Sequence, residues 1–332
     1  MHRTMPKHLI TLLSLLCLSW FISSNAKGQV LSPKNNEKLV YAKPNEPIKL
    51  KAGDPHPKLD KWYFYTAHEF HDQHNRNGLP LGFLEHNTTF MSRMAKVDNQ
   101  SCAKVEHGVL HIETHYHPDS IDNGYDKSVV LSTAAFRTPP PNHPEFWCKF
   151  TENMRIEVRL KRSDTQGINN ALWFMGNNGK PWPENGEIDL LENPKKKINQ
   201  VAHFTLHSKN HHAGVMGGSG SVTAKVELED MTQWNIYWIE WYPNRIVGGV
   251  NGTAYFQHDK GANNNLDWPW SDPEGFFMLI TTGVSTNPKA WPGAVNPKEW
   301  EQNIAPSMDV DWIRVYTLSP SDKLNAPKRM YY

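Results

Sequence analysis

Apolar and polar residues alternate along most of the chain, and this pattern predicts β-strands rather than helices. In the stretch 154–161, "MRIEVRLK", every second residue is apolar and the residues between them carry charge. The stretch 103–116 alternates in the same way on both sides of a turn at Gly108. Strands of this kind present one apolar face to a core and one polar face to water.

Further apolar stretches, each bounded by turn residues, extend the prediction to the whole chain. The stretch 234–257 contains two strands, and its Asn251-Gly252 dipeptide is a strong hairpin signal. Two more strands are expected within 273–284 and 308–318. Many short strands separated by Gly, Pro and Asn predict an all-β sandwich or jelly roll. We find no internal repeat and no long linker.

Three carboxylates lie close together in the stretch 184–193, "ENGEIDLLEN". Glu187 and Asp189 are two residues apart, so they share one face of a strand. Glu192 is five residues from Glu187 and belongs to the opposite face of a regular strand. A β-bulge at Leu190–Leu191 would shift the alternation by one residue and turn Glu192 onto the face of the other two acids. We therefore predict a bulge at this point.

The surroundings of the three acids are mostly apolar, which favours a functional role over a solvated turn. Buried charges are costly unless they have partners. Carboxyl groups about 5–5.5 Å apart suit a retaining glycosidase. Neighbouring like charges push pKa values apart, so Asp189 is expected to keep Glu187 ionised and Glu192 protonated.

The first 26 residues read as an export signal, with basic residues, an apolar run and small residues before Ala26. The apolar run is too short to span a bilayer, and no other run is long enough. We expect cleavage near Ala26 and a location in the periplasm, on the cell surface or outside the cell. A lipoprotein anchored at Cys17 is the less favoured alternative.

The remaining chain is divided by composition. Residues 27–60 are rich in Pro and Lys and are expected to wrap around the outside of the fold. Residues 61–317 are expected to form one catalytic domain, and residues 318–332 a loose tail. We expect a monomer.

Composition narrows the class of partner. The formal net charge is +1, so no overall field attracts nucleic acid. The chain contains 13 Trp and 17 His, which is unusually many. Tryptophan has flat apolar faces that can stack on sugar rings, although many of these residues will fill a β core. A polysaccharide or glycan is the expected partner, with neither nucleic acid nor a membrane span.

Two cysteines follow the predicted signal, Cys102 and Cys148, and they are candidates for a disulfide in an exported protein. His203 and His207 share a face of the strand after the acids and raise the alternative of a zinc hydrolase. No carboxylate or cysteine near them in the sequence completes such a site, and neither cysteine belongs to a C-x-x-C pair.

The stretch 186–192, "GEIDLLE", resembles the active-site motif of glycoside hydrolase family 16 in its bulged form. The stretches "SCAKVEHGVLHIET", "WNIYWIEWYPNRIVGGVNGTAYF" and "MDVDWIRVY" resemble strands of that family in the same order. The resemblance covers most of the chain after the signal. It implies a curved, concanavalin A-like jelly-roll β-sandwich with an open cleft, and cleavage within β-linked glycans with retention of configuration.

The resemblance also assigns roles. By motif position Glu187 corresponds to the nucleophile, Glu192 to the acid/base and Asp189 to the assisting carboxylate. Trp173 corresponds to a tryptophan that stacks on a sugar beside the cleavage point. Asp311 occupies a position that can bind a structural calcium ion on the convex face, while the chemistry itself requires no cofactor.

Further substrate contacts are expected from Trp182 and Trp291, as stacking platforms, and from His207, as a partner of sugar hydroxyls or of the acid/base. Departures from the β-1,3-glucanase pattern bear on the substrate. Asn169 and Asn170 replace an aromatic residue and a proline, and Gly248-Gly249 replaces another aromatic. We expect Asn170 and Gly248 to make the cleft roomier and more polar.

These departures favour a galactose-containing β-glycan, such as an algal galactan, keratan or a mucin chain. Agarases and endo-β-galactosidases share the bulged motif. An endo-β-1,3(4)-glucanase of the laminarinase type remains the alternative. A non-catalytic glycan-binding module is a second alternative, but such a module has no need for the three intact acids.

Overall fold

The computed structural model describes residues 49–71, 77–86, 96–119, 130–194, 201–211, 222–261 and 267–320. The predicted signal at 1–26, with Cys17, lies outside these residues, as do residues 27–48 of the wrapping segment and residues 321–332 of the tail.

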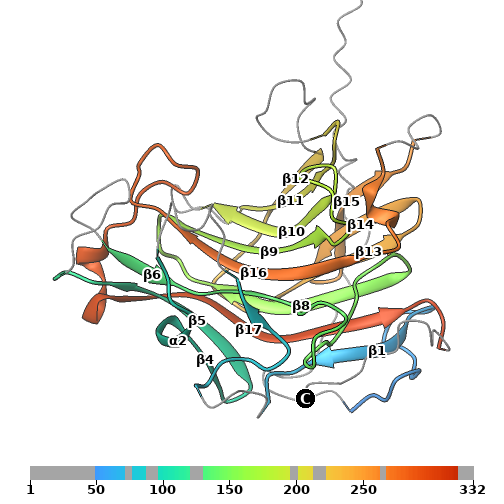
Figure 1. Ribbon diagram of the computed structural model, residues 1–332, viewed down its shortest axis with the longest axis horizontal. Helices are drawn as coiled ribbons and strands as arrows, with labels where there is room; N and C mark the ends of the chain where they lie inside the picture. Colours follow the sequence, from blue (N-terminus) through green and yellow to red (C-terminus); the bar gives the residue numbers. More distant parts are fainter. Residues whose placement is uncertain are drawn as a thin grey trace, which may run out of the picture.

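The described chain folds into two large β-sheets that lie one over the other (Figure 1). The 10-stranded sheet has the order β15 (Thr253–Asp259), β14 (Arg245–Val250), β13 (Asn235–Tyr242), β8 (Met154–Arg162), β17 (Ile304–Thr317), β5 (Val109–Tyr116), β6 (Leu131–Thr133) and β3 (Lys96–Val97), with β1 (Tyr63–His68) paired to β17 and β4 (Ala103–Glu106) to β5. The 7-stranded sheet has the order β12 (Val222–Glu227), β11 (Val201–His207), β10 (Glu187–Pro194), β9 (Ile168–Gly176), β16 (Phe276–Val284), β7 (Ala135–Arg137) and β2 (Leu84–Glu85).

The predicted all-β sandwich is confirmed, and helices are restricted to short pieces such as α2 (Asn99–Cys102) and the 3₁₀ turns η1 (Pro269–Ser271), η2 (Pro297–Glu299) and η3 (Glu301–Asn303). The predicted hairpin at Asn251-Gly252 joins β14 to β15, and both residues have positive φ angles, 50° and 86°. This conformation matches the right-handed twist of the flanking strands, which is why Asn-Gly is favoured there. No helix of the described residues is long and apolar enough to cross a membrane.

The core lies between the sheets and is built from the inward-facing residues of both. In β9, Leu172 and Phe174 are buried in the core, whereas Trp173 and Met175 on the other face are partly exposed. Phe174 packs edge-on against Trp241 of the larger sheet, with 6.1 Å between ring centroids. The smaller sheet therefore has one face in the core and one face available for a site.

The polar face of β8 is buried, so the prediction that it meets water is wrong. Arg155 and Glu157 are 2% and 0% exposed, and an ion pair of 2.7 Å joins Arg155 Nε to Glu157 Oε1. His56, from the segment before β1, lies over this face, with Nε2 3.4 Å from Glu157 Oε1 and its ring 4.5 Å from that of Tyr316. The charges escape water because this segment covers them, and they are tolerated because they are paired.

Cys102 and Cys148 are both buried in the core and both carry free thiols, so the candidate disulfide is not formed. Burial raises the pKa of the Cys102 thiol to about 12 and raises that of Cys148 as well. Both residues behave as small apolar side chains of the core.

Gly248 does not line a cleft, which corrects the expectation for this position. It lies in β14 of the larger sheet and faces the interior, where a Cβ atom would come within 2.3 Å of the Phe204 ring of β11. Phe204 stacks on Phe256 with 4.2 Å between centroids. The missing side chain therefore makes room for an aromatic residue of the core rather than for a sugar.

We predict that Gly248→Ala destabilises the protein by about 1–3 kcal/mol, because the added methyl group overpacks the contact with Phe204. Denaturant unfolding measures this difference. Phe204→Leu introduced together with Gly248→Ala should recover part of the loss, because the double variant frees the space that the methyl group needs. A Gly248→Ala variant as stable as the parent would contradict the packing described here.

Candidate active site

The predicted β-bulge is present in β10. Glu187 pairs with His207 of β11, and Glu192 pairs with His203, four residues earlier in that strand. Six residues of β10, from Glu187 to Glu192, therefore lie opposite five residues of β11, with the register shift between Asp189 and Glu192. The side chains of Leu190 and Leu191 are both fully buried in the core. The extra residue brings Glu192 onto the face of Glu187 and Asp189, as the parity argument requires.

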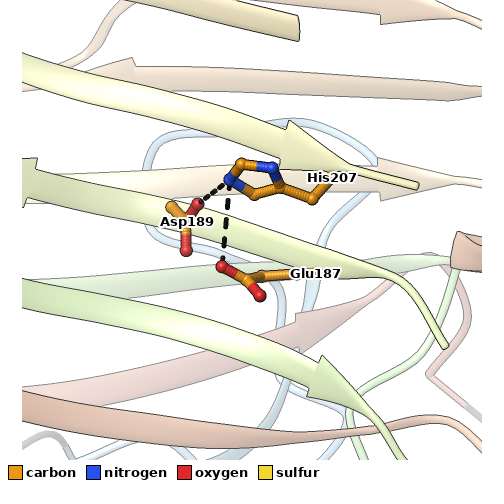
Figure 2. Close-up of side chains that lie close together, drawn as sticks. All are labelled: Glu187, Asp189 and His207. Carbon is orange, nitrogen blue, oxygen red and sulfur yellow. Dashed lines mark ion pairs between the residues drawn. The ribbon is translucent and has the colours of Figure 1, made fainter. Parts of the chain in front are cut away.

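His207 completes a compact cluster with two of the acids (Figure 2). Its Nε2 atom lies 3.2 Å from Asp189 Oδ2 and 3.9 Å from Glu187 Oε1. Trp182, from the loop before β10, donates a hydrogen bond of 2.6 Å from Nε1 to Glu187 Oε2. Glu187 is thus held between a cross-strand histidine and an indole N–H.

Burial raises the pKa of Glu187 well above its ordinary value, and the charge of Asp189 raises it further. His207 and the Trp182 hydrogen bond act in the opposite direction. Burial also raises the pKa of Asp189, with the charge of Glu192 as the next cause. A hydrogen bond between Glu187 and Asp189 raises the pKa of the first and lowers that of the second. In the free protein Asp189 therefore raises the pKa of Glu187, through its charge and through the shared hydrogen bond, contrary to the expectation that Asp189 keeps Glu187 ionised.

The pKa of Glu192 is raised from 4.5 to about 7, first by burial and then by the charge of Glu187. His207 and a hydrogen bond of 3.5 Å from Asn169 Nδ2 to Glu192 Oε1 partly offset this shift. A carboxylic acid with a pKa near neutrality can donate a proton and later accept one, which is what acid/base catalysis needs.

The three candidate tryptophans all lie near these acids. Trp173 is opposite Asp189 on the neighbouring strand β9 and donates a hydrogen bond of 3.0 Å to Thr281. Trp182 is 42% exposed and Trp291 is 50% exposed, so both offer ring faces to a ligand. The Trp291 ring lies 5.5 Å from the ring of His203, which pairs with Glu192.

Asn170 is fully buried, so the expectation that it contacts a substrate is wrong. It points to the core side of β9 and donates a hydrogen bond of 3.4 Å to Thr282. Asn169 is the cleft residue instead, and its amide reaches Glu192. Strand alternation could have shown this, because Asn169 has the parity of Trp173 and Asn170 does not.

The sequence raises two metal sites, a zinc site at the histidines and a calcium site at Asp311. Glu187, Asp189 and His207 offer ligand atoms that all lie within 4.8 Å of one another, so a metal ion could be held there. The carboxylates come from the adjacent strand, which is why the sequence around the histidines did not show them. His203 is not part of this group.

Asp311 does not fit a calcium site. Its side chain is 1% exposed, and one carboxylate oxygen accepts a hydrogen bond from Arg159 Nη1. A guanidinium ion thus already neutralises this carboxylate in the interior, and a cation would have to displace it. Calcium prefers several oxygen ligands without a competing positive charge.

Residues 113–314 match the family model of the glycosyl hydrolases family 16. The chain belongs to this family. A keratan-sulfate endo-1,4-β-galactosidase of Sphingobacterium multivorum is 27% identical over 168 residues, 49% of this chain and 36% of that protein. A β-glucanase of Rhodothermus marinus is 30% identical over 177 residues, 49% of this chain and 56% of that protein. The chain therefore spans less than two thirds of the length of either relative.

Solved structures of family 16 enzymes share the fold. The laminarinase catalytic domain from Thermotoga maritima MSB8 superposes with a TM-score of 0.60 at 24% identity, covering 77% of this chain and 98% of that one. A structure from work on endo-acting O-glycanases, which members of the human gut microbiota express to initiate mucin breakdown, gives a TM-score of 0.59 at 20% identity, covering 77% of this chain and 99% of that one.

We predict that Glu192→Gln makes this family 16 protein more stable at pH 8. The folded-state pKa of Glu192 is raised, so the parent loses stability as the pH rises from about 4.5 through about 7, because the unfolded chain releases this proton more readily. Glutamine resembles the protonated acid, so the variant does not lose the stability that the parent loses when Glu192 ionises. Thermal unfolding of both proteins at pH 4 and pH 8 measures this difference in stability.

The expected result is a higher melting temperature for Glu192→Gln at pH 8 and a smaller difference at pH 4. Glu85→Gln, at an exposed position of β2, is the matched control and should behave like the parent at both pH values. A Glu192→Gln variant that is equally or less stable than the parent at pH 8 would contradict the burial of this carboxylate.

Proposed function

We propose that the protein is a secreted, endo-acting, retaining glycoside hydrolase that cleaves internal β-linkages of a galactose-containing glycan. The observation that carries the hydrolase proposal is the bulged strand β10, which brings onto one face the buried Asp189 and the half-buried Glu187 and Glu192, all with raised pKa values. Family membership and the neighbouring aromatic residues support a glycan substrate.

In the proposed reaction Glu192 donates its proton to the glycosidic oxygen while Glu187 attacks the anomeric carbon. The C–O bond to the leaving sugar breaks and a glycosyl ester of Glu187 forms. Glu192, now ionised, takes a proton from water, and the water oxygen displaces Glu187 from the sugar. Both carboxyl groups return to their starting states.

Glu187 must be ionised to attack, and Asp189 offers the means. The two acids share a hydrogen bond that, in the free protein, raises the pKa of Glu187 and lowers that of Asp189, so the proposed reaction requires the shared proton to move to Asp189 before the attack. A protonated Asp189 then donates a hydrogen bond to an ionised Glu187. The Trp182 N–H and His207 stabilise the same negative charge, since both lower the pKa of Glu187.

The matched relatives and the residues beside Glu192 bear on the choice of substrate. A keratan-sulfate endo-galactosidase and a β-glucanase match the chain over similar lengths, so a glucanase of the laminarinase type is the second candidate. Asn169 supports the galactan, because it places an amide beside Glu192 where the glucanase pattern has an aromatic residue. An amide can recognise a sugar hydroxyl and penalise an epimer that leaves it unpaired.

Secretion is proposed from the N-terminal sequence alone. The order of basic, apolar and small residues in 1–26 is that of a signal peptide. A polymeric glycan is also too large to enter a cell intact, so an exported enzyme agrees with the proposed substrate.

We predict that Glu187→Gln lowers the hydrolysis rate by about 10³-fold or more, because the covalent route is lost. Glu184→Gln is the matched control, since this exposed acid lies three residues earlier in the chain and pairs with Lys209. It should retain parental activity. If Glu187→Gln cleaves at the parental rate, Glu187 is not the nucleophile. If the parent protein binds glycans but cleaves none, the protein is a binding module.

The same assay with a chelator separates the glycosidase from a zinc hydrolase that uses Glu187, Asp189 and His207. We expect full activity after treatment with EDTA, because the proposed steps involve only carboxyl groups and water. Activity that disappears with EDTA and returns with added zinc would overturn the proposed mechanism. Product NMR during early turnover should show the β-anomer first, as retention requires.

A panel of polysaccharides tests the substrate proposal. We predict release of oligosaccharides from at least one of agarose, porphyran, keratan and mucin glycans, with slow cleavage of laminarin and mixed-linkage glucan. Mass spectrometry of early products measures both the linkage class and the endo mode. Fast cleavage of laminarin together with no action on any galactan would establish the glucanase instead.

A further inference from the structure

Arg137 lies on the same face of the smaller sheet as the proposed catalytic acids. It pairs with Leu279 of β16, Leu279 pairs with Trp173, and Trp173 pairs with Asp189. Directly paired residues of antiparallel strands point to the same side. Phe136, one residue earlier, is in the core, so the alternation of β7 agrees with this placement.

The distance from the acids makes Arg137 a subsite residue rather than a catalytic residue. β7, β16, β9 and β10 are successive neighbours in the sheet. At about 4.8 Å between strands, the Cα atoms of Arg137 and Asp189 are roughly 14 Å apart. A group bound at Arg137 would therefore belong to a sugar some way along the chain from the bond that is cut.

The guanidinium of Arg137 has no ion pair or hydrogen bond among the described residues. It lies over the ring of Phe277 on β16, with 5.7 Å between Cζ and the ring centroid. This contact leaves the in-plane N–H groups open, and these groups are suited to a sulfate or a carboxylate. By contrast, Arg155 is paired with Glu157 and Arg314 with Glu69.

A small pocket that is open to solvent lies beside Arg137 at this end of the sheet. Its lining includes Asn177, with an exposed amide, and Lys149, whose Nζ donates to the backbone oxygen of Pro273. The lining also contains one acidic residue, Glu274, compared with two cationic residues, Arg137 and Lys149. The pocket therefore combines an unpaired guanidinium, a second positive charge and an amide around a space open to solvent.

His86 extends the polar surface from Arg137 towards the acids. Its ring lies 6.5 Å from that of Trp173, in an edge-to-face arrangement. Its Nε2 atom is buried and lacks a hydrogen-bond partner within the described part of the chain. Burial and the charge of Arg137 lower its pKa to about 4, so it is neutral at physiological pH.

We propose that Arg137, with Asn177 and Lys149, forms a subsite that binds an anionic substituent, a sulfate ester or a carboxylate, on a sugar remote from the cleaved bond. This inference rests on the proposed function and narrows its substrate class to charged glycans. The Phe277 ring and the neutral His86 would contact the sugar rings between this subsite and Trp173.

The test compares matched pairs of substrates. Keratan sulfate and chemically desulfated keratan test a sulfate ester, and a sialylated glycan with its desialylated form tests a carboxylate. kcat/KM is measured for the parent, for Arg137→Met and for Lys225→Met. Lys225 is the matched control, because it is an exposed cation paired with His203 on the same sheet face, at the opposite end of the sheet.

We expect the parent to prefer the charged member of one pair and Arg137→Met to lose about 10- to 100-fold on it, the value of one charge-assisted hydrogen bond. Arg137→Met should cleave the uncharged member at the parental rate, and this also shows that the variant is folded. Lys225→Met should keep the preference of the parent.

Three outcomes would overturn the subsite. The parent could cleave both members of each pair equally, Arg137→Met could lose the same factor on charged and uncharged substrates, or Lys225→Met could lose as much as Arg137→Met. A parent that cleaves only laminarin would instead refute the proposed galactan substrate. In that case the subsite is tested by binding alone. The two charged glycans and their two uncharged forms are bound to the Glu187→Gln variant with and without Arg137→Met, and the subsite is supported only if Arg137→Met weakens binding of a charged glycan.

Discussion

The gathering of three buried or half-buried carboxylates on one face of β10 is the constraint around which the smaller sheet is organised. Each acid would be far more stable in water, and together they repel one another when ionised. They remain in place because β10 lies between β9 and β11, and its other face carries Leu190 and Leu191 into the core. The sheet that displays the acids is thus held by apolar contacts on its opposite side.

The two faces with buried charge handle that charge differently. On the outer face of the larger sheet, Arg155 and Glu157 neutralise each other, and Arg314 binds Glu69 through two hydrogen bonds of 2.8 and 2.9 Å. On β10 the acids face one histidine, one indole N–H and one amide, so the negative charge is only partly compensated. Paired charges make a rigid support, whereas uncompensated acids keep protons that a reaction can use.

The sequence predicted what depends on local alternation and composition, namely the all-β class, the Asn251-Gly252 hairpin and the bulge before Glu192. Predictions from the sequence were wrong where burial depends on a segment that is distant in the chain and packs over a strand. The charged face of β8 looked exposed because nothing in its own residues reveals that His56 lies on it.

Errors at single positions have similar physical causes. The sequence does not show to which sheet the strand of Gly248 belongs, so it cannot reveal the contact of this position with Phe204. The calcium role of Asp311 follows from the family resemblance, and the sequence does not reveal its pairing with the distant Arg159. Pairing of Cys102 with Cys148 depends on a spatial separation that no spacing encodes. Asn170 is a different case, since strict parity with Trp173 would have selected Asn169.

The bulge also determines where the gene can change length without dismantling the site. Loss of one leucine codon between Asp189 and Glu192 would leave the acids at positions one, three and five of a regular strand, all on the same face. Such a deletion removes one buried leucine, a cost of about 2–5 kcal/mol by analogy with truncation to alanine. Loss of the Ile188 codon would instead make two acids adjacent and point them to opposite sides. Deletion of one leucine codon is therefore the short in-frame deletion in this strand that keeps the three acids on one face. This single genetic step connects the bulged and unbulged forms of the motif.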